Sequence, residues 1–183
     1  MLHMRIRIIH IIFAVLVAGS GPLAAEVYLA PDAFVAQVFD GSPPAPKAVW
    51  IDADLRQQLA GVLGHPPPGL RVRYWGQQGR TVWILDEIGK HQPITIGVVV
   101  DRGEIEQLKV LAFRESRGWE IRYPFFTEQF QRLHLTPKGE LSGRVDGITG
   151  ATLSVGATTR TAKAALVLHD HSDEATTTLA ISQ

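Results

Sequence analysis

Apolar residues recur at helical spacing in two segments of the N-terminal third. The segment 31–38 opens with Pro and Asp and predicts a short helix, which ends at the turn-rich GSPPAP segment, 41–46. Asp52 is placed to cap a longer amphipathic helix over 52–63, whose apolar residues share one face. The apolar AVWI segment, 48–51, lies between the two helices and predicts a strand.

From residue 70 the spacing of apolar residues changes to the alternation that is typical of strands. The β-branched and aromatic segments 70–76 and 81–89 are separated by a short turn, so they predict a β-hairpin. The segments 94–100 and 105–113 repeat this pattern across a second turn. The sequence therefore predicts four consecutive strands.

Two further helices are expected in the C-terminal half. The segment 122–133, which carries three Phe residues, predicts a helix, and a second helix is predicted from 155 to 169 with Ser154 as its N-cap. The polar tail, 170–183, is expected to be frayed, although LAISQ, 179–183, could add an edge strand. Helices that flank consecutive hairpins favour a single α+β domain with a curved, mostly antiparallel sheet.

The N-terminus has the layout of a secretory signal peptide. Arg5 and Arg7 precede an apolar run from Ile8 to Ala18, and small residues follow up to Ala25. The run of about a dozen residues is shorter than the roughly 20 that a bilayer span needs, so a retained anchor is the less favoured alternative. We expect cleavage near Ala25 and a periplasmic or otherwise exported protein.

These patterns divide the chain into four parts. Residues 1–25 are the expected signal peptide, and 26–69 form a lead-in of helices and a strand. Residues 70–169 form the main domain, and 170–183 form the polar tail.

Composition and charge limit the cofactors and partners that this chain can use. The 183 residues include no cysteine, which excludes disulfides, thiolate nucleophiles, cysteine-ligated iron–sulfur clusters and covalent c-type haem within this chain. The 18 Lys and Arg residues balance the 18 Asp and Glu residues, which argues against nucleic acid or an anionic membrane surface as a partner. Redox chemistry in this chain would therefore need an organic cofactor.

The DGITGATLS segment places a single hydroxyl, that of Thr152, among small residues just before a helix. Gly147 and Gly150 allow a left-handed backbone and a close approach of a bulky group, and Ala151 leaves the side of the site open. A helix N-terminus attracts anions through its unpaired amides and its dipole, so a phosphate ester on Thr152 would be stabilised there. The alternative is an ordinary small-residue turn in which Thr is the cap.

This segment resembles the flavinylation motif of the FMN-binding domain family, Asp-x-x-Ser/Thr-Gly-Ala-Thr/Ser, at every constrained position. The family includes covalently flavinylated subunits of sodium-pumping NADH:quinone reductases and Rnf complexes. The resemblance implies that a flavin transferase moves FMN from FAD to Thr152 and that Asp146 is the acidic residue the transferase needs. Asp146 could otherwise be an ordinary turn aspartate. Thr149 either bonds the phosphate or closes the turn. The motif residues assigned to FMN are Asp146, Gly147, Thr149, Gly150, Ala151, Thr152 and Ser154.

A second segment, VLAFRESRGWEI, resembles the strand and loop that precede the threonine in the same family. Glu115, Ser116 and Gly118 keep the family pattern, whereas Arg117 stands where the family often has Pro and Trp119 where it has Leu. A flavin ring needs an apolar or aromatic wall, which Trp119 could supply, or Trp119 is a core residue. Arg117 could neutralise the phosphate or the reduced flavin, or it is a solvated surface residue.

The resemblance implies an electron-transfer flavoprotein that carries FMN through a threonine phosphodiester. We expect it to be a carrier rather than a stand-alone enzyme, with no catalytic residue of its own. Its expected partners are the FMN transferase and haem-containing or other redox proteins, with a membrane redox complex as a further possibility. The alternatives are a non-redox FMN-binding or sensor module, and a flavin-dependent reductase of a small substrate.

Four further polar residues have two interpretations each. Arg160 and Lys163 follow the motif and could add positive charge near the phosphodiester, or they are solvated charges on a helix face. His169 and His171 form an HxH pair that could hold a metal in a strand, but a solvated pair in the tail is the expected state, so no metal site is expected.

Overall fold

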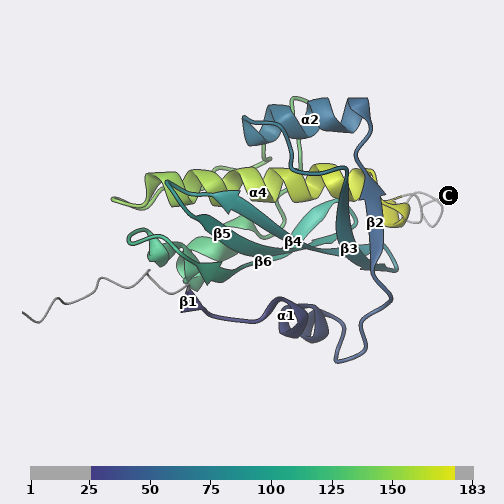
Figure 1. Ribbon diagram of the computed structural model, residues 1–183, viewed down its shortest axis with the longest axis horizontal. Helices are drawn as coiled ribbons and strands as arrows, with labels where there is room; N and C mark the ends of the chain where they lie inside the picture. The colour runs from purple at the N-terminus through teal and green to yellow at the C-terminus, as the bar shows by residue number, and fades with distance from the viewer. Residues whose placement is uncertain (1–25, 176–183) are drawn as a thin grey trace, which may run out of the picture.

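The computed structural model describes residues 26–175, which fold around one six-stranded antiparallel sheet in the order β1-β6-β5-β4-β3-β2 (Figure 1). This confirms the α+β prediction for a single domain. The elements in chain order are β1 Glu26–Val27, α1 Pro31–Val38, β2 Lys47–Trp50, α2 Ala53–Leu63, β3 Arg71–Gln77, β4 Arg80–Ile88, β5 Pro93–Asp101, β6 Glu104–Phe113, the 3₁₀-helix η1 Trp119–Arg122, α3 Pro124–Thr127, the 3₁₀-helix η2 Glu128–Phe130 and α4 Thr152–Asp170.

Both predicted hairpins are confirmed. β3 pairs with β4 and β5 pairs with β6, each pair antiparallel and joined by a two-residue loop. Gln78 and Gly79 in the first loop, and Arg102 and Gly103 in the second, all have positive φ, as the two-residue hairpin turns with the right twist require. The turn chemistry therefore sets the register of the four central strands.

The two faces of the sheet are covered by different helices. α4 lies along one face in contact with β4 and β5, and α2 packs against α4, whereas α1 packs on the opposite face (Figure 1). Neighbouring residues in a strand point to opposite faces, so Trp83 joins the α4 side of the core and Val82 joins the α1 side. Burial of both faces explains why the central strands are nearly continuous runs of apolar residues.

The lead-in is part of the same core. β2 pairs with β3 and β1 pairs with β6, so both outer strands of the sheet come from residues 26–69. The predicted cap of α2 is confirmed, because the Asp52 side chain accepts a hydrogen bond from the Leu55 N–H at 2.9 Å. The predicted helix over 31–38 is also confirmed as α1.

The helix predicted over 122–133 is wrong, because this segment forms short pieces instead. Tyr123 has an extended backbone, with ψ of 150°, and separates η1 from α3. Pro124 follows it, and a proline disfavours helical geometry at the residue before it. At Gln131 the backbone is again extended, with ψ of 134°, which ends η2.

The last helix begins earlier than expected and ends at Asp170, close to the predicted end near His169. α4 starts at Thr152, so Ser154 is not its N-cap but lies in its first turn, with 4% of its surface exposed. The beginning of the expected frayed tail is packed, because Glu174 is buried, accepts from Lys47 Nζ at 2.9 Å and accepts from the Gly79 N–H at 3.2 Å.

The expected signal peptide and the possible strand over 179–183 lie outside the described residues. In residues 26–175, no helix is long and apolar enough to span a membrane.

Candidate functional site

A cleft of about 550 Å³ lies at the N-terminal end of α4. Three segments line it: residues 90–91 from the β4–β5 turn, 115–117 from the loop after β6, and 150–154 from the start of α4. The two segments that the sequence analysis selected separately are therefore walls of one cleft. The turn at 90–91 is a third wall that the sequence analysis missed, because a basic residue in a hairpin turn is an ordinary surface feature.

Thr152 is the first residue of α4, and its side chain is exposed in the cleft. The helix begins with the hydrogen bond from the Val155 N–H to the Ala151 carbonyl at 2.9 Å. The amides of the first turn precede that bond and therefore have no partner within the helix. They give the Thr152 end of the cleft the positive end of the α4 dipole.

Gly150 provides the backbone turn that leads into α4. Its φ is +83°, and a Cβ there would meet nothing within 4 Å, so the requirement for glycine comes from the backbone conformation rather than from space. Gly147 does not have a positive φ, so the expectation of a left-handed backbone there was wrong.

Gly118 joins the two predicted segments directly. Its φ is +90°, and a Cβ at this position would lie 2.4 Å from the Ser154 Oγ and 3.4 Å from the Ala151 Cβ. The loop after β6 and the first turn of α4 can pack this closely only because Gly118, Ala151 and Ser154 are small. Gly118 itself does not line the cleft but keeps Arg117 and Thr152 on neighbouring walls.

The Glu115 carboxylate holds the turn that forms the third wall. Its Oε1 accepts hydrogen bonds from the backbone N–H groups of Lys90 at 2.6 Å, of His91, and of Gln92 at 2.8 Å. Burial alone would raise the pKa of Glu115, but these N–H donors outweigh it and lower the pKa. The carboxylate that was expected to bind cofactor is thus engaged with the protein backbone.

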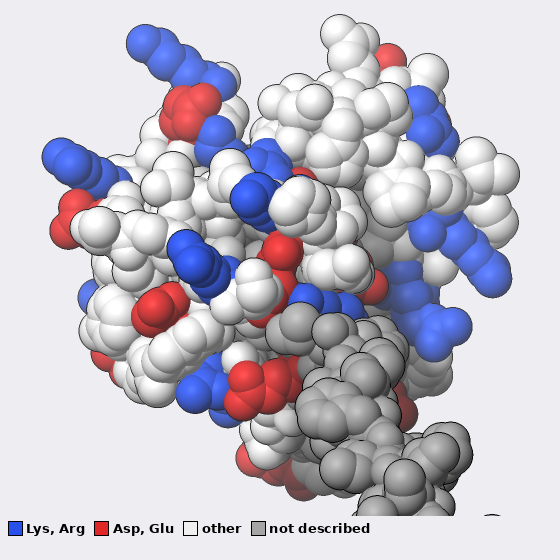
Figure 2. Space-filling view, turned by 60° about the vertical axis from the view of Figure 1, so that its left-hand side comes forward, with Lys and Arg blue, Asp and Glu red and all other residues white. Residues whose placement is uncertain are grey.

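Two basic side chains, Lys90 and Arg117, line the cleft together with His91, and Glu115 is the acidic residue among the lining residues. The wider surface has no single sign of charge. Figure 2 turns this end of the molecule toward the viewer and shows basic and acidic side chains interspersed over it. The positive character is therefore local to the cleft.

Some of the predicted site residues lie outside the cleft lining. Asp146 is exposed, its carboxylate is 3.4 Å from Arg144 Nε, and its backbone N–H donates to Gln129 Oε1 at 2.7 Å. Gly147 and Thr149 are also exposed residues of the connection before α4.

Trp119 is neither a core residue nor part of the cleft lining. It is 40% exposed and lies edge-on to Tyr123, with 5.7 Å between the ring centroids. The Arg122 guanidinium stacks over the Trp119 ring at 5.1 Å. The core interpretation of Trp119 was therefore wrong, and its ring forms part of an exposed aromatic surface.

Arg160 does not line the cleft and pairs instead with a buried carboxylate. Its Nε and Nη2 donate to the Glu87 Oε1 at 2.9 and 2.7 Å, and Glu87 is only 4% exposed. The His65 Nε2 lies 3.1 Å from the same carboxylate. The Pro66 carbonyl, 3.0 Å from His65 Nδ1, and then the Glu87 carboxylate raise the pKa of His65. Neither interpretation of Arg160 describes its position, because the side chain is paired with buried Glu87 and does not line the cleft.

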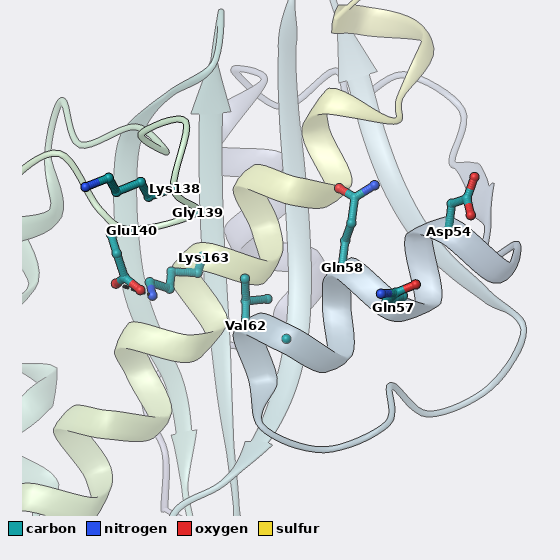
Figure 3. A pocket seen from close by; sticks show the side chains of 9 residues that line it. Asp54, Gln57, Gln58, Val62, Lys138, Gly139, Glu140 and Lys163 are labelled. Carbon is teal, nitrogen blue, oxygen red and sulfur yellow. Dashed lines mark hydrogen bonds and ion pairs between the residues drawn. The ribbon is translucent and has the colours of Figure 1, made fainter.

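Lys163 is also occupied elsewhere. Its Nζ donates to the Glu140 Oε2 at 2.6 Å in a second cleft, of about 610 Å³, between α2, α4 and the turn at 138–140. Figure 3 shows these two side chains pointing toward one another, with Gln57 and Gln58 of α2 on the facing wall. Lys163 therefore does not contribute charge at Thr152.

The HxH pair is neither frayed nor arranged as a metal site. His169 is 1% exposed, its Nδ1 lies 2.8 Å from the Thr81 Oγ1, and burial lowers its pKa. His171 Nδ1 contacts the Val167 carbonyl at 2.9 Å. Within residues 26–175, no group of three or more His, Asp or Glu side chains is placed to hold a metal.

Comparison with known families identifies the domain in which this cleft lies. Residues 89–167 match the family model of the FMN-binding domain, and this range contains all three walls of the cleft. The chain contains an FMN-binding domain. It is thus a flavin-binding protein, as the resemblance of the DGITGATLS segment implied.

Other similarities are local. Thiosulfate sulfurtransferase of Pseudomonas aeruginosa is 46% identical over 55 residues, which are 28% of this chain and 20% of the relative. This chain therefore spans about a fifth of the length of the curated relative that it matches. No solved structure matches the chain.

The residues of the cleft fit the phosphate end of FMN. Lys90 and Arg117 are cationic, Thr152 presents a hydroxyl, and the amides of the first turn of α4 are donors. The volume of about 550 Å³ is in the range of cofactor clefts. The lining contains no Phe, Tyr or Trp, and its large exposed apolar side chain is Leu153, 52% exposed. The cleft therefore offers more binding groups for the FMN phosphate than for the isoalloxazine ring.

Proposed function

We propose that the protein is an exported electron-transfer flavoprotein whose FMN is joined to Thr152 by a phosphodiester bond. The observation that carries the proposal is the position of Thr152. It is an exposed hydroxyl at the first residue of α4, inside the cleft where the two family segments of the FMN-binding domain meet. The anion-stabilising amides of that helix end support a phosphate at this oxygen.

Attachment requires a transferase and FAD as the donor. The Thr152 oxygen forms a new bond to the phosphorus that carries the flavin, the bond from that phosphorus to the AMP part breaks, and the hydroxyl proton is released with AMP. Asp146 and Thr149 are exposed beside Thr152 in the sequence, so a transferase can reach both. We assign Asp146 to recognition by the transferase rather than to the cleft.

When bound, FMN supplies the exchange of one or two electrons. The chain contributes position and environment. Lys90, Arg117 and the first turn of α4 hold the phosphate, and Leu153 and Trp119, which are sequence neighbours of Ser154 and Gly118, offer exposed apolar surface. A covalent tether also prevents loss of the cofactor in a compartment without a flavin pool. We propose haem-containing or other redox proteins, free or in a membrane complex, as electron partners.

The relative's sulfurtransferase activity is not carried over to this chain. The similarity covers a fifth of that protein, and this chain has no cysteine whose thiolate could accept or donate sulfur.

Intact mass spectrometry tests the attachment. Full-length chain co-produced with a flavin transferase should gain the mass of one FMN less one water, and Thr152→Ala should abolish the gain. Thr152→Ser keeps a hydroxyl and should keep at least part of it. Ser42→Ala is the control, because Ser42 is an exposed hydroxyl residue outside the motif that does not line the cleft. An unmodified wild-type chain, or a Thr152→Ala chain that still gains the mass, contradicts the proposal.

The electron-carrier role needs a separate measurement. Flavinylated protein is reduced without oxygen and mixed with an oxidised haem protein, and flavin absorbance is followed. A carrier is reoxidised as the haem is reduced. A sensor module would show no transfer, and a reductase would turn over a soluble donor with a small substrate instead. Cell fractionation tests export, which predicts flavinylated protein outside the cytoplasm.

A further inference from the structure

The turn between β4 and β5 is held by a carboxylate from a distant part of the chain. Three successive backbone N–H groups, of Lys90, His91 and Gln92, converge on one oxygen of Glu115. The Gly89 N–H also donates to the Gln92 carbonyl at 3.1 Å, which closes the turn. Consecutive amides that point at one anion form the kind of concavity that binds free anions in other proteins. Here the protein's own carboxylate fills it.

This arrangement determines where the adjacent side chains lie. Lys90 and His91 extend from the clamped turn into the cleft, and Arg117 lies two residues beyond Glu115 on the next wall. Glu115 thus joins two cationic walls through one side chain. Its negative charge is matched by three N–H donors, so the cationic groups are the charges left to meet a ligand.

We propose that Lys90 and Arg117 form a phosphate-recognition pair that distinguishes FMN from unphosphorylated flavin, and that Glu115 is a positioning residue for this pair rather than a flavin ligand. The inference rests on the proposed attachment at Thr152, because it places the phosphate beside that oxygen. It adds a turn that has no counterpart in the two motif segments. It also makes Glu115 a residue that positions the cationic pair, whereas its place in the motif suggested that it contacts the flavin.

Flavin binding without attachment tests the pair. Full-length Thr152→Ala cannot be esterified at that position, and FMN and riboflavin, which differ by the phosphate alone, are titrated into it while flavin fluorescence is measured. We expect FMN to bind about tenfold or more tightly than riboflavin, since a charge-assisted hydrogen bond has this magnitude. Adding Lys90→Ala or Arg117→Ala should bring the two affinities together by weakening FMN alone. Lys138→Ala is the control, because Lys138 lines the other cleft.

The variant Glu115→Ala separates positioning from simple electrostatics, because it removes both the negative charge and the oxygen that accepts from the turn amides. Removing a negative charge beside the cleft should tighten FMN binding if Glu115 were a bystander. If Glu115 positions Lys90, its loss should instead weaken FMN binding, leave riboflavin binding nearly unchanged, and speed hydrogen exchange at the amides of 90–92. Unchanged or tighter FMN binding with unchanged exchange overturns the positioning role.

The rate of FMN incorporation covers the case in which free flavin binds too weakly to titrate. In the chain that keeps Thr152, Lys90→Ala and Arg117→Ala should slow incorporation about tenfold or more relative to Lys138→Ala. Equal affinities of FMN and riboflavin for Thr152→Ala, or wild-type incorporation in both cleft variants, overturns the pair. The two proposals fail differently. A wild-type chain that gains no flavin mass refutes attachment at Thr152. A chain that gains the mass normally but binds FMN and riboflavin equally well refutes only the phosphate-recognition pair.

Discussion

Replacing Gly118 by alanine tests the contact that assembles the cleft. The Gly118 backbone has φ of +90°, and the added methyl group would lie 2.4 Å from the Ser154 Oγ, 3.2 Å from the Ser154 Cβ and 3.4 Å from the Ala151 Cβ. Ser154 is 4% exposed and Ala151 is 3% exposed, so neither side chain has free space to move into. We expect Gly118→Ala both to destabilise the fold and to separate the walls of the cleft.

The expected cost has two parts. An alanine with a left-handed backbone costs about 1–2 kcal/mol relative to glycine. Overpacking by one methyl group against a buried helix turn costs about 1–3 kcal/mol, of which rotation of the Ser154 hydroxyl relieves a part. Together they predict a fall in the free energy of unfolding of about 2–4 kcal/mol.

Denaturant unfolding of a glycine series separates the two parts. Gly150→Ala has the same backbone cost, with φ of +83°, but meets no atom within 4 Å, so it should cost about 1–2 kcal/mol. Gly147→Ala has neither problem and should change the free energy of unfolding by less than about 0.5 kcal/mol. The double variant Gly118→Ala with Ser154→Ala removes the closest contact and should be less destabilised than the sum of the single variants.

Two results would refute this reasoning. One is a Gly118→Ala protein that is no less stable than Gly150→Ala, which would mean that the close packing has no energetic effect. The other is strict additivity of Gly118→Ala and Ser154→Ala, which would mean that the two residues do not press on each other. FMN incorporation measured on the same variants should follow the order of stability loss.

Three further predictions follow from residues whose roles the structure changed. Arg160→Ala leaves the buried Glu87 carboxylate with His65 as its remaining basic partner and should lower the free energy of unfolding by about 1–3 kcal/mol in denaturant titration, with FMN incorporation at the wild-type level. An incorporation defect without a stability defect would return Arg160 to the flavin site. Burial lowers the pKa of His169 in the folded chain, so the unfolded chain takes up the proton first. The contribution of His169 to the free energy of unfolding should therefore be constant above the ordinary pKa of 6.5 and fall as the pH drops below it. The loss should reach at most about 1.4 kcal/mol per pH unit, and His169→Gln should flatten this part of the profile of unfolding free energy against pH. Trp119→Ala should change the free energy of unfolding by less than about 1 kcal/mol, since Trp119 is 40% exposed, whereas Trp83→Ala, at 0% exposed, should cost about 3–5 kcal/mol, and a reversal of this order would return Trp119 to the core.

The sequence by itself determined the hairpins and the start of α2, because the geometry of these elements depends on residues that are close together in the chain. The alternating strands and their two-residue turns predicted both hairpins, because a turn with positive φ and a period of two are properties of a short segment. Asp52 predicted the start of α2 for the same reason, since a cap bonds an amide three residues away. The break at Tyr123 before Pro124 also has a local cause, because a proline disfavours helical geometry at the preceding residue, and the helix predicted over 122–133 did not take it into account.

The sequence by itself also selected Thr152 and the two segments of the FMN-binding domain, because spacing within a motif is a local property. The tertiary structure alone decided which side chains meet there. Glu115 bonds Gln92 across 23 residues of chain, and Arg160 bonds Glu87 across 73. The partner of a charged side chain depends on which strands and helices pack together. The two motif segments by themselves could therefore not show that Glu115 holds the turn at 90–92, or that Arg160 pairs with Glu87.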